Sequence, residues 1–301
     1  MAEHIEAPGL GAGSLVIIGG AEDRRYSKDI LARFVALAGG PGRKIVVVTA
    51  ASTVPEEIWD IYDRAFEGLG VGCRLPLHVR SRADANDATL VRELDDAGGI
   101  FMTGGDQKRL LGMIGGTALD AAMHTALQMH GACIGGTSAG ASAMSGHMLA
   151  DGAANLAPEK GAVRLGAGLG LVQQVVIDQH FSERHRLNRL LTIVAQNPNL
   201  RGVGIDENTA LVVMLGAGIE VIGEGSVSII DGRAVISNVA DIGNGETPEL
   251  IDVRLHLLPA GSRHLLSPPG AEAPHGAPAY AGTPAPLLDF VHSVTKRSVS
   301  S

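Results

Sequence analysis

Short apolar runs rich in β-branched residues alternate with longer amphipathic segments along the first two thirds of the chain. The apolar runs predict strands at Ser14–Ile18, Lys44–Thr49, Gly72–His78, Gly99–Thr103, Ala132–Gly135 and Val175–Asp178. The segments between them predict helices near Ser27–Leu37, Pro55–Leu69, Ala88–Ala97, Thr117–Met129 and Ser182–Gln196. Alternation at this spacing is typical of βαβ units, so we expect an α/β fold with a mostly parallel sheet and helices on both faces.

From about Gly202 the pattern changes to short strands joined by tight turns such as Asp231-Gly232. The predicted strands are Gly202–Asp206, Thr209–Leu215, Ile219–Gly223 and Ser226–Ile230. Tight turns connect antiparallel strands, so we expect these segments to form hairpins at one edge of the sheet.

The composition changes again near the C-terminus. Residues 259–286 are rich in Pro, Ala, Gly and Ser, a composition that cannot bury a core. We therefore expect one α/β domain over residues 1–258 and a flexible tail over residues 259–301, in which Leu287–Lys296 forms a short helix.

Composition and charge narrow the class of protein. The 301 residues are 45% hydrophobic, and the net charge of −8 comes without a basic cluster, which argues against a nucleic-acid-binding surface. Cys73 and Cys133 lie far apart and suit neither a disulfide framework nor a metal site. The N-terminus lacks the pattern of a signal peptide, and no apolar run reaches the ~18 residues of a membrane span. We expect a soluble cytoplasmic protein without a metal or cofactor.

The segment Gly136-Thr137-Ser138-Ala139-Gly140 matches the G-x-S-x-G nucleophile elbow, in which a strand turns sharply into a helix and exposes a serine hydroxyl. Small residues are needed there because the sharp turn brings backbone segments close together. The motif predicts a serine hydrolase with Ser138 as the nucleophile. The alternative is a Gly-rich turn that binds a phosphate or only packs tightly.

A serine nucleophile needs a base, usually histidine, and a group that orients the base. Among the eleven histidines, His180 follows an apolar run and is expected at the carboxyl end of a strand, where sites in α/β sheets gather. His185 is the rival, but its charged helical surroundings favour a solvated surface position. The other histidines that we considered have no comparable context; they are His78, His124, His130 and His147.

For the orienting acid, Asp206 and Glu207 both follow an apolar strand. Spacing does not choose between them. It also does not exclude a purely structural role, in which the carboxylate accepts hydrogen bonds from backbone N–H groups of a turn. An oxyanion hole needs two N–H donors, and Ala139, the residue after the nucleophile, is expected to supply one. The other donor could be Gly104 or Gly105 in a second loop at a strand end, where glycine allows a close approach to substrate.

Arg184, Arg186 and Arg189 lie just after the candidate base, in a chain that is acidic as a whole. Apolar residues recur at helical spacing in the same stretch, so the arginines could simply cover the solvated face of a helix. The functional alternative is a clamp for substrate carboxylates, because guanidinium groups bind carboxylates in a bidentate manner. Asp178 and Gln179 beside them could bind a cation such as a substrate guanidinium.

Several of these segments occur together in one order between roughly residues 14 and 257. They are Ile18-Gly19-Gly20-Ala21-Glu22, Thr103-Gly104-Gly105-Asp106-Gln107, Gly136-Thr137-Ser138-Ala139-Gly140-Ala141, Asp178-Gln179-His180-Phe181 with the three arginines, and Gly204-Ile205-Asp206-Glu207. In this combination the chain resembles the serine peptidase family that contains cyanophycinase and aspartyl dipeptidase.

The resemblance implies a flavodoxin-like α/β fold of the class I glutamine amidotransferase type. It implies that Ser138 is the nucleophile, His180 the base and Glu207 its partner. This Ser, His, acid order differs from the Ser, acid, His order of α/β-hydrolases. It also implies a set of substrate-binding residues, namely Gln107, Asp178, Gln179, Arg184, Arg186 and Arg189.

The resemblance further implies a substrate, cyanophycin, which is a polymer with an aspartate backbone and an arginine on each β-carboxyl. The product would be the β-Asp-Arg dipeptide, and the protein would be a homodimer. An aspartyl dipeptidase with the same triad is one rival, although the arginine run favours cyanophycin. A Cys133 nucleophile is another, but its place inside the predicted strand favours an inert core thiol. A non-catalytic module that holds an anion at the Ser138 turn is the third.

Overall fold

The structure, a computed structural model, describes residues 12–152, 154–266 and 283–297. Among these residues eight strands form one large sheet, in which five neighbouring strands run parallel in the order β3-β2-β4-β5-β1. The parallel strands are β1 (Ser14–Ile18), β2 (Lys44–Val48), β3 (Arg74–Leu77), β4 (Ala97–Met102) and β5 (Cys133–Thr137). The mostly parallel sheet predicted from the sequence is confirmed.

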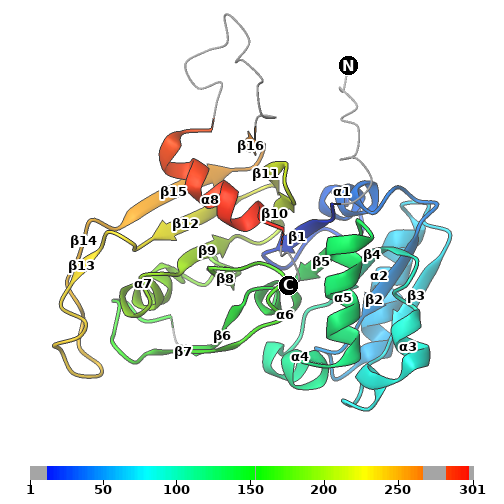
Figure 1. The fold of residues 1–301 in the computed structure, drawn as a ribbon, viewed down its shortest axis with the longest axis horizontal. Coiled ribbons are helices and arrows are strands. Elements are labelled where there is room, and N and C mark those ends of the chain that lie inside the picture. Colours follow the sequence, from blue (N-terminus) through cyan, green and yellow to red (C-terminus); the bar gives the residue numbers. More distant parts are fainter. Residues whose placement is uncertain (1–11, 153, 267–282, 298–301) are drawn as a thin grey trace, which may run out of the picture.

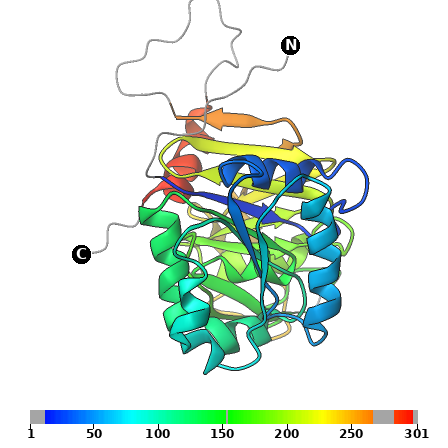
Figure 2. The same ribbon diagram turned by 90° about the vertical axis from the view of Figure 1, so that its right-hand side faces the viewer.

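Helices cover both faces of this sheet, as Figure 2 shows from the side. Consecutive residues of β1 point into different cores: Val16 packs with one set of helices and Ile17 with the other, which is the alternation expected of a strand. One set is α1 (Asp29–Leu37) and α2 (Pro55–Glu67). The other set is α4 (Gln107–Ile114) and α5 (Ala118–Met129), next to the short helices η1 (Asp84–Asn86) and α3 (Ala88–Arg92). The sequence pattern did not predict α4.

Three antiparallel strands extend the sheet beyond β1. They are β10 (Thr209–Met214), β11 (Gly218–Gly223) and β16 (Arg263–Leu265). The hairpin of β10 and β11 lies at one edge of the parallel block, as predicted. β16 falls within the Pro- and Gly-rich segment, where we expected no strand.

A second sheet lies beside the first, in the left half of Figure 1. Its strands, in order across the sheet, are β15 (Arg254–Pro259), β12 (Ser226–Asp231), β9 (Arg201–Ile205) and β8 (Val175–Gln179). The predictions placed β8, β9 and β12 in the main sheet or at its edge, and this was wrong, because all three belong to the second sheet. There β12 pairs antiparallel with β9, and β9 pairs in parallel with β8. The physical reason is that α7 (Leu187–Gln196) connects the two strands, and a helical crossover returns the chain in the parallel direction.

Smaller elements complete the described chain. The short helix α6 (Ala139–Ala143) follows β5, and the antiparallel pairs are β6 (His147–Gly152) with β7 (Val163–Ala167) and β13 (Ile236–Ser237) with β14 (Leu250–Ile251). Where a C-terminal helix was expected over Leu287–Lys296, the structure has α8 (Ala285–Thr295), which docks on the body through buried residues such as Phe290 and Val291. Residues 267–282 of the predicted tail lie outside the described residues.

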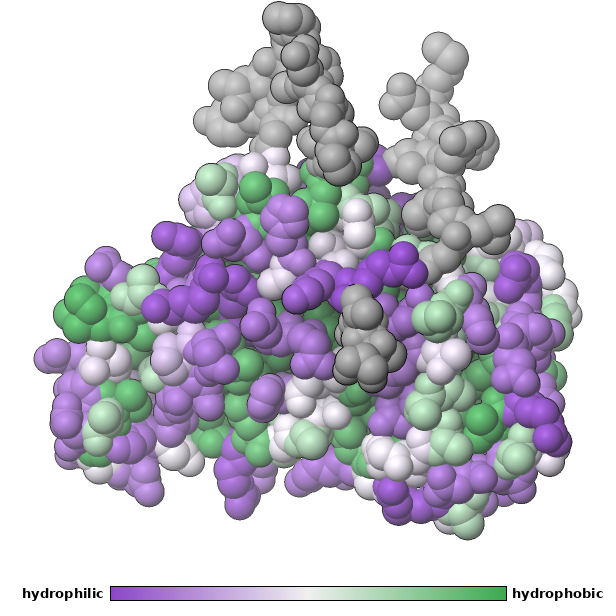
Figure 3. Space-filling model, viewed as in Figure 1, coloured by the Kyte–Doolittle hydropathy of each residue, from purple (hydrophilic) through white to green (hydrophobic). Residues whose placement is uncertain are grey.

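The face seen in Figure 3 is mostly hydrophilic, with an apolar group over the β13–β14 pair, where Ile236 and Ile251 are exposed. Within the described ranges, no helix combines the length and the apolar character that a membrane span requires.

Candidate active site

Ser138 lies at the point where β5 ends and α6 begins. Its backbone has a positive φ of 51°, and its side chain is partly exposed while the flanking residues are buried. The glycines on either side have no room for a side chain: a Cβ at Gly136 would lie 2.6 Å from the Gly140 oxygen, and one at Gly140 would lie 2.4 Å from the Met102 oxygen. The backbone is therefore bent so that only the serine reaches the surface.

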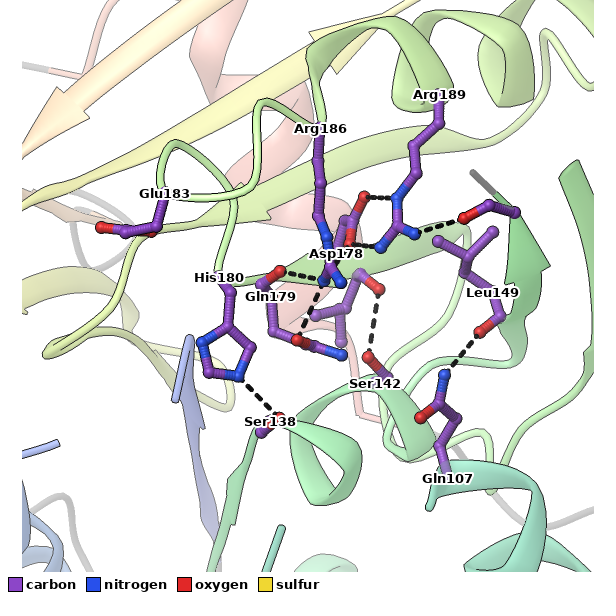
Figure 4. Close-up of polar contacts among 12 residues, drawn as sticks. Gln107, Ser138, Ser142, Leu149, Asp178, Gln179, His180, Glu183, Arg186 and Arg189 are labelled. Atoms are coloured by element: carbon purple, nitrogen blue, oxygen red, sulfur yellow. Dashed lines mark hydrogen bonds and ion pairs between the residues drawn. The ribbon is translucent and has the colours of Figure 1, made fainter. Parts of the chain in front are cut away.

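The hydroxyl of Ser138 meets His180, which follows β8 of the second sheet (Figure 4). Ser138 Oγ lies 2.9 Å from His180 Nε2, and His180 Nδ1 lies 2.5 Å from Glu207 Oε1. The His180 side chain is nearly buried, at 11% exposed, whereas His185 is exposed. The structure thus joins Ser138, His180 and Glu207 in one line of hydrogen bonds.

Asp206, the alternative acid, has different partners. Its carboxylate accepts hydrogen bonds from the Ser182 backbone N–H (3.1 Å), the Ser226 backbone N–H (3.0 Å) and the Ser226 hydroxyl (2.8 Å). Asp206 therefore holds the turns around the site together, and Glu207 is the acid that reaches the histidine.

The segment that follows β1 connects these residues to one another. Three successive backbone carbonyls there accept hydrogen bonds from residues that belong to, or adjoin, the line of Ser138, His180 and Glu207. The Ser138 N–H donates to Ile18 (3.1 Å), the His180 N–H to Gly19 (2.8 Å) and the Asn208 N–H to Gly20 (2.9 Å). The end of β1 thereby fixes residues from both sheets against a single short stretch of backbone.

The residues after β1 were part of the family resemblance, but sequence reasoning assigned them no role in the site. The Glu22 carboxyl is buried and accepts hydrogen bonds from the Tyr62 hydroxyl and the Thr137 hydroxyl, both at 2.5 Å. A buried carboxylate needs such partners. Because Thr137 precedes Ser138, Glu22 braces the strand that carries the serine. An acid two residues after a Gly-Gly pair at a strand end is the signal that could have pointed to it.

Candidate oxyanion donors lie on two sides of Ser138. Ala139 is the first residue of α6, so its N–H lies at the start of a helix. On the other side, a Cβ built on Gly104 would lie 3.5 Å from Ser138 Cβ, and Gly105 has a φ of +146°. Within the described part of the chain, the N–H groups of Gly104 and Gly105 donate no hydrogen bond. Both glycine N–H groups are therefore available to a substrate oxygen.

Beside His180 lies a buried ionic cluster of Asp178, Gln179, Arg186 and Arg189 (Figure 4). Arg189 Nε donates to one Asp178 oxygen at 2.6 Å, and Arg186 Nη1 donates to the other at 3.2 Å and to Gln179 Oε1 at 3.0 Å. Burial lowers the pKa of the Arg186 guanidinium to about 10, with Asp178 opposing and Arg189 adding to the effect. Arg186 and Arg189 do not lie on a solvated helix face, whereas Arg184 is exposed.

Two further sequence candidates have clear positions. Gln107 is the first residue of α4, and its amide donates to the Leu149 oxygen at 3.4 Å. Cys133 lies at the beginning of β5, at the opposite end from Ser138, and burial raises the pKa of its thiol. Because it is buried at this position, Cys133 is expected to be an unreactive thiol in the core.

Comparisons with known proteins agree with this geometry. The model of peptidase family S51 matches residues 15–221. The chain is 38% identical over 252 residues to a cyanophycinase of Geminocystis herdmanii, covering 83% of this chain and 93% of that relative. It is 35% identical over 251 residues to a cyanophycinase of a Nostoc species, covering 83% of this chain and 84% of that relative.

Among solved structures, a peptidase from an acI-B1 Actinobacterium shares the fold, with a TM-score of 0.63 and 23% identity over 86% of this chain and 99% of that chain. The family model covers more than half of the sequence, and the curated relatives match over most of their own length. The chain therefore belongs to peptidase family S51.

Proposed function

We propose that the protein is a serine exopeptidase that hydrolyses cyanophycin and releases β-Asp-Arg dipeptides. The observation that carries the chemistry is the line of hydrogen bonds from Ser138 Oγ through His180 to Glu207. A hydroxyl in contact with an imidazole, which is in turn oriented by a carboxylate, is the arrangement of an activated serine nucleophile. The substrate class comes from the relatives named cyanophycinase, which match most of the chain.

In the proposed mechanism His180 Nε2 takes the proton of the Ser138 hydroxyl as Oγ attacks the scissile backbone carbonyl. The N–H groups of Ala139 and Gly105, or Gly104 in its place, hold the oxyanion. His180 then returns the proton to the leaving amine, and water hydrolyses the acyl-enzyme by the same steps in reverse. Glu207 accepts the Nδ1–H bond and stabilises the imidazolium.

The ionic cluster beside His180 supports a charged substrate. Two guanidinium groups, those of Arg186 and Arg189, share the single carboxylate of Asp178, so the cluster keeps an excess of positive charge. The exposed Arg184 adds to the positive charge that acts on Arg186. We propose that Asp178 holds the buried arginines in place and that the excess charge binds a substrate carboxylate. Gln107 and Gln179 would contribute amide contacts in the same pocket.

We also propose that the fold is of the class I glutamine amidotransferase, flavodoxin-like type. If β2 is counted as the first strand, the order β3-β2-β4-β5 becomes 2-1-3-4, which is the strand order of doubly wound sheets of the flavodoxin type. Such sheets have a switch point between neighbouring strands. The homodimer and the cytoplasmic location implied earlier stay predictions, which light scattering and cell fractionation would test.

The proposed function is tested by incubating the purified protein with cyanophycin and identifying the soluble products by mass spectrometry. Release of β-Asp-Arg, absent in Ser138→Ala, is the expected result. Cleavage only of short peptides that begin with aspartate would instead support an aspartyl dipeptidase. Absence of both activities, and of labelling at Ser138 by a fluorophosphonate, would favour the non-catalytic module.

Gly20→Ala is expected to lower kcat by about 10²-fold, because small displacements of a catalytic group are costly. A Cβ at Gly20 would lie 2.3 Å from His180 Cε1 and would push the ring away from Ser138. Gly40→Ala is the matched control, since Gly40 also has a positive φ, 93° against 102°, but no atom lies within 4 Å of its Cβ. Steady-state cyanophycin turnover measures the effect, and equal kcat values in the two variants would contradict the proposed position of His180.

A further inference from the structure

A cavity of about 610 Å³ lies between the loop after β1 and helix α2. This volume is within the range of roughly 300–1,000 Å³ that is typical of ligand sites. Most of its lining is charged, and the lining residues are Glu22, Asp23, Arg24, Arg25, Lys28, Ile61 and Arg64. The sequence analysis assigned none of these side chains to the site.

The two acids of this lining are already engaged. Glu22 accepts hydrogen bonds from Tyr62 and Thr137, as described above. Asp23 accepts hydrogen bonds from the backbone N–H groups of the residues that follow it, including those of Arg25 (2.9 Å) and Ser27 (2.7 Å). Glu22 is thus buried with its partners, whereas Asp23 is half-buried and its carboxylate is held by the backbone of its own turn.

The four cations, by contrast, lack ion pairs. Among the described residues, no carboxylate forms a salt bridge with Arg24, Arg25, Lys28 or Arg64. Arg24 lies over the Tyr62 ring, with its guanidinium carbon 5.7 Å from the ring centroid, and Arg64 donates to a backbone oxygen of its own helix. The lining carries four cations and two acids, a formal net charge of +2 in a chain with a net charge of −8, so the cavity is a local site of positive potential.

The cavity is connected to the candidate active site through short contacts. Glu22 lines it and binds the hydroxyl of Thr137, the residue before Ser138. The Asp23 N–H donates to the Asn208 side chain at 2.9 Å, and Asn208 is the residue after Glu207. The loop that carries the cations is thereby held in a defined position relative to the nucleophile and its acid.

We propose that this cavity, which we call the cationic cavity, binds carboxylates of a cyanophycin repeat other than the one being released. The proposal rests on the proposed function, because it assigns a second part of the same substrate. Each repeat of the polymer carries carboxylate as well as guanidinium, and a lining with unpaired cations selects the carboxylate. The cationic cavity would therefore let the enzyme distinguish the polymer from a free dipeptide.

Calorimetry tests this proposal by measuring how tightly β-Asp-Arg oligomers bind to the full chain carrying Ser138→Ala. This variant allows binding to be measured without turnover. Arg25→Gln/Arg64→Gln removes two exposed charges of the lining and leaves Arg24 on its tyrosine. In this variant the affinity for oligomers of several repeats should fall by about tenfold, the effect of two partly solvated ion pairs. The affinity for a single β-Asp-Arg should stay unchanged, because one repeat fills only the cluster beside His180.

Arg43→Gln/Arg92→Gln is the matched control, because both arginines are exposed and neither lines the cationic cavity. It should bind every oligomer as the Ser138→Ala parent does. The proposal is overturned if the Arg25/Arg64 variant matches this control for long oligomers, or if it weakens the single dipeptide as strongly as the oligomers. Failure of the proposed function is distinct: the wild-type protein would then release no β-Asp-Arg, and the Ser138→Ala chain would bind no oligomer.

Discussion

Ser138→Ala is expected to lower kcat for cyanophycin hydrolysis by about 10⁴- to 10⁶-fold while the fold is retained. Among the described residues the Ser138 side chain makes one hydrogen bond, to His180 Nε2, so its loss removes the proposed nucleophile and leaves the surrounding contacts intact. The remaining rate would come from the oxyanion donors and substrate binding alone. Release of β-Asp-Arg under steady-state conditions measures the effect, and thermal unfolding shows that the variant is folded.

The control for this experiment is Ser142→Ala, one turn further along α6. The Ser142 hydroxyl donates only a long bond of 3.5 Å to the Ile177 oxygen and does not contact His180. Its removal should leave kcat nearly unchanged. If Ser138→Ala kept the activity of Ser142→Ala, the nucleophile would have to be sought elsewhere in the chain.

Asp178→Ala is expected to lower the free energy of unfolding by about 3–5 kcal/mol, the cost of leaving buried charges without their partner. The Asp178 side chain is 1% exposed, and it is the carboxylate that pairs with Arg186 and Arg189, whose side chains are 10% and 9% exposed. Without it, two guanidinium groups repel each other in a nearly dry environment. Urea-induced unfolding measures the change.

A solvated ion pair provides the comparison. Asp151 pairs with Arg164 at 2.9 Å, but the two side chains are 55% and 79% exposed. Asp151→Ala should therefore change the free energy of unfolding by less than about 1 kcal/mol. Asp178→Asn should fall between the two, because the amide oxygen can still accept one guanidinium bond. An Asp178→Ala protein as stable as Asp151→Ala would show that the cluster does not stabilise the fold.

The sequence pattern predicted the features that depend on local periodicity. Strand-helix alternation indicated the parallel block of the main sheet, and the small residues around Ser138 indicated a sharp turn between a strand and a helix. Both are local properties, because a strand alternates with period two and a tight turn excludes side chains at fixed positions. Position after an apolar run also singled out His180. The catalytic roles of these residues stay predictions until the variants are measured.

Other features were set by contacts between segments far apart in the chain. The apolar pattern of β8 and β9 suits either sheet, so the sequence could not show that these strands belong to the second sheet. It also could not show that they place His180 and Glu207 near the end of β5, where Ser138 lies. Asp206 and Glu207 are neighbours with similar chemistry, and only their partners separate the acid that braces the turns from the one that reaches the histidine.

By itself, the sequence determined the α/β class, the helices and strands with strong periodicity, and a candidate nucleophile and base, since each depends on residues within one segment. The tertiary structure decided the second sheet, the buried pairing of Asp178 with Arg186 and Arg189, and the cationic cavity. Burial and pairing of charges depend on what the fold brings alongside them, and that information is absent from the spacing of residues along the chain.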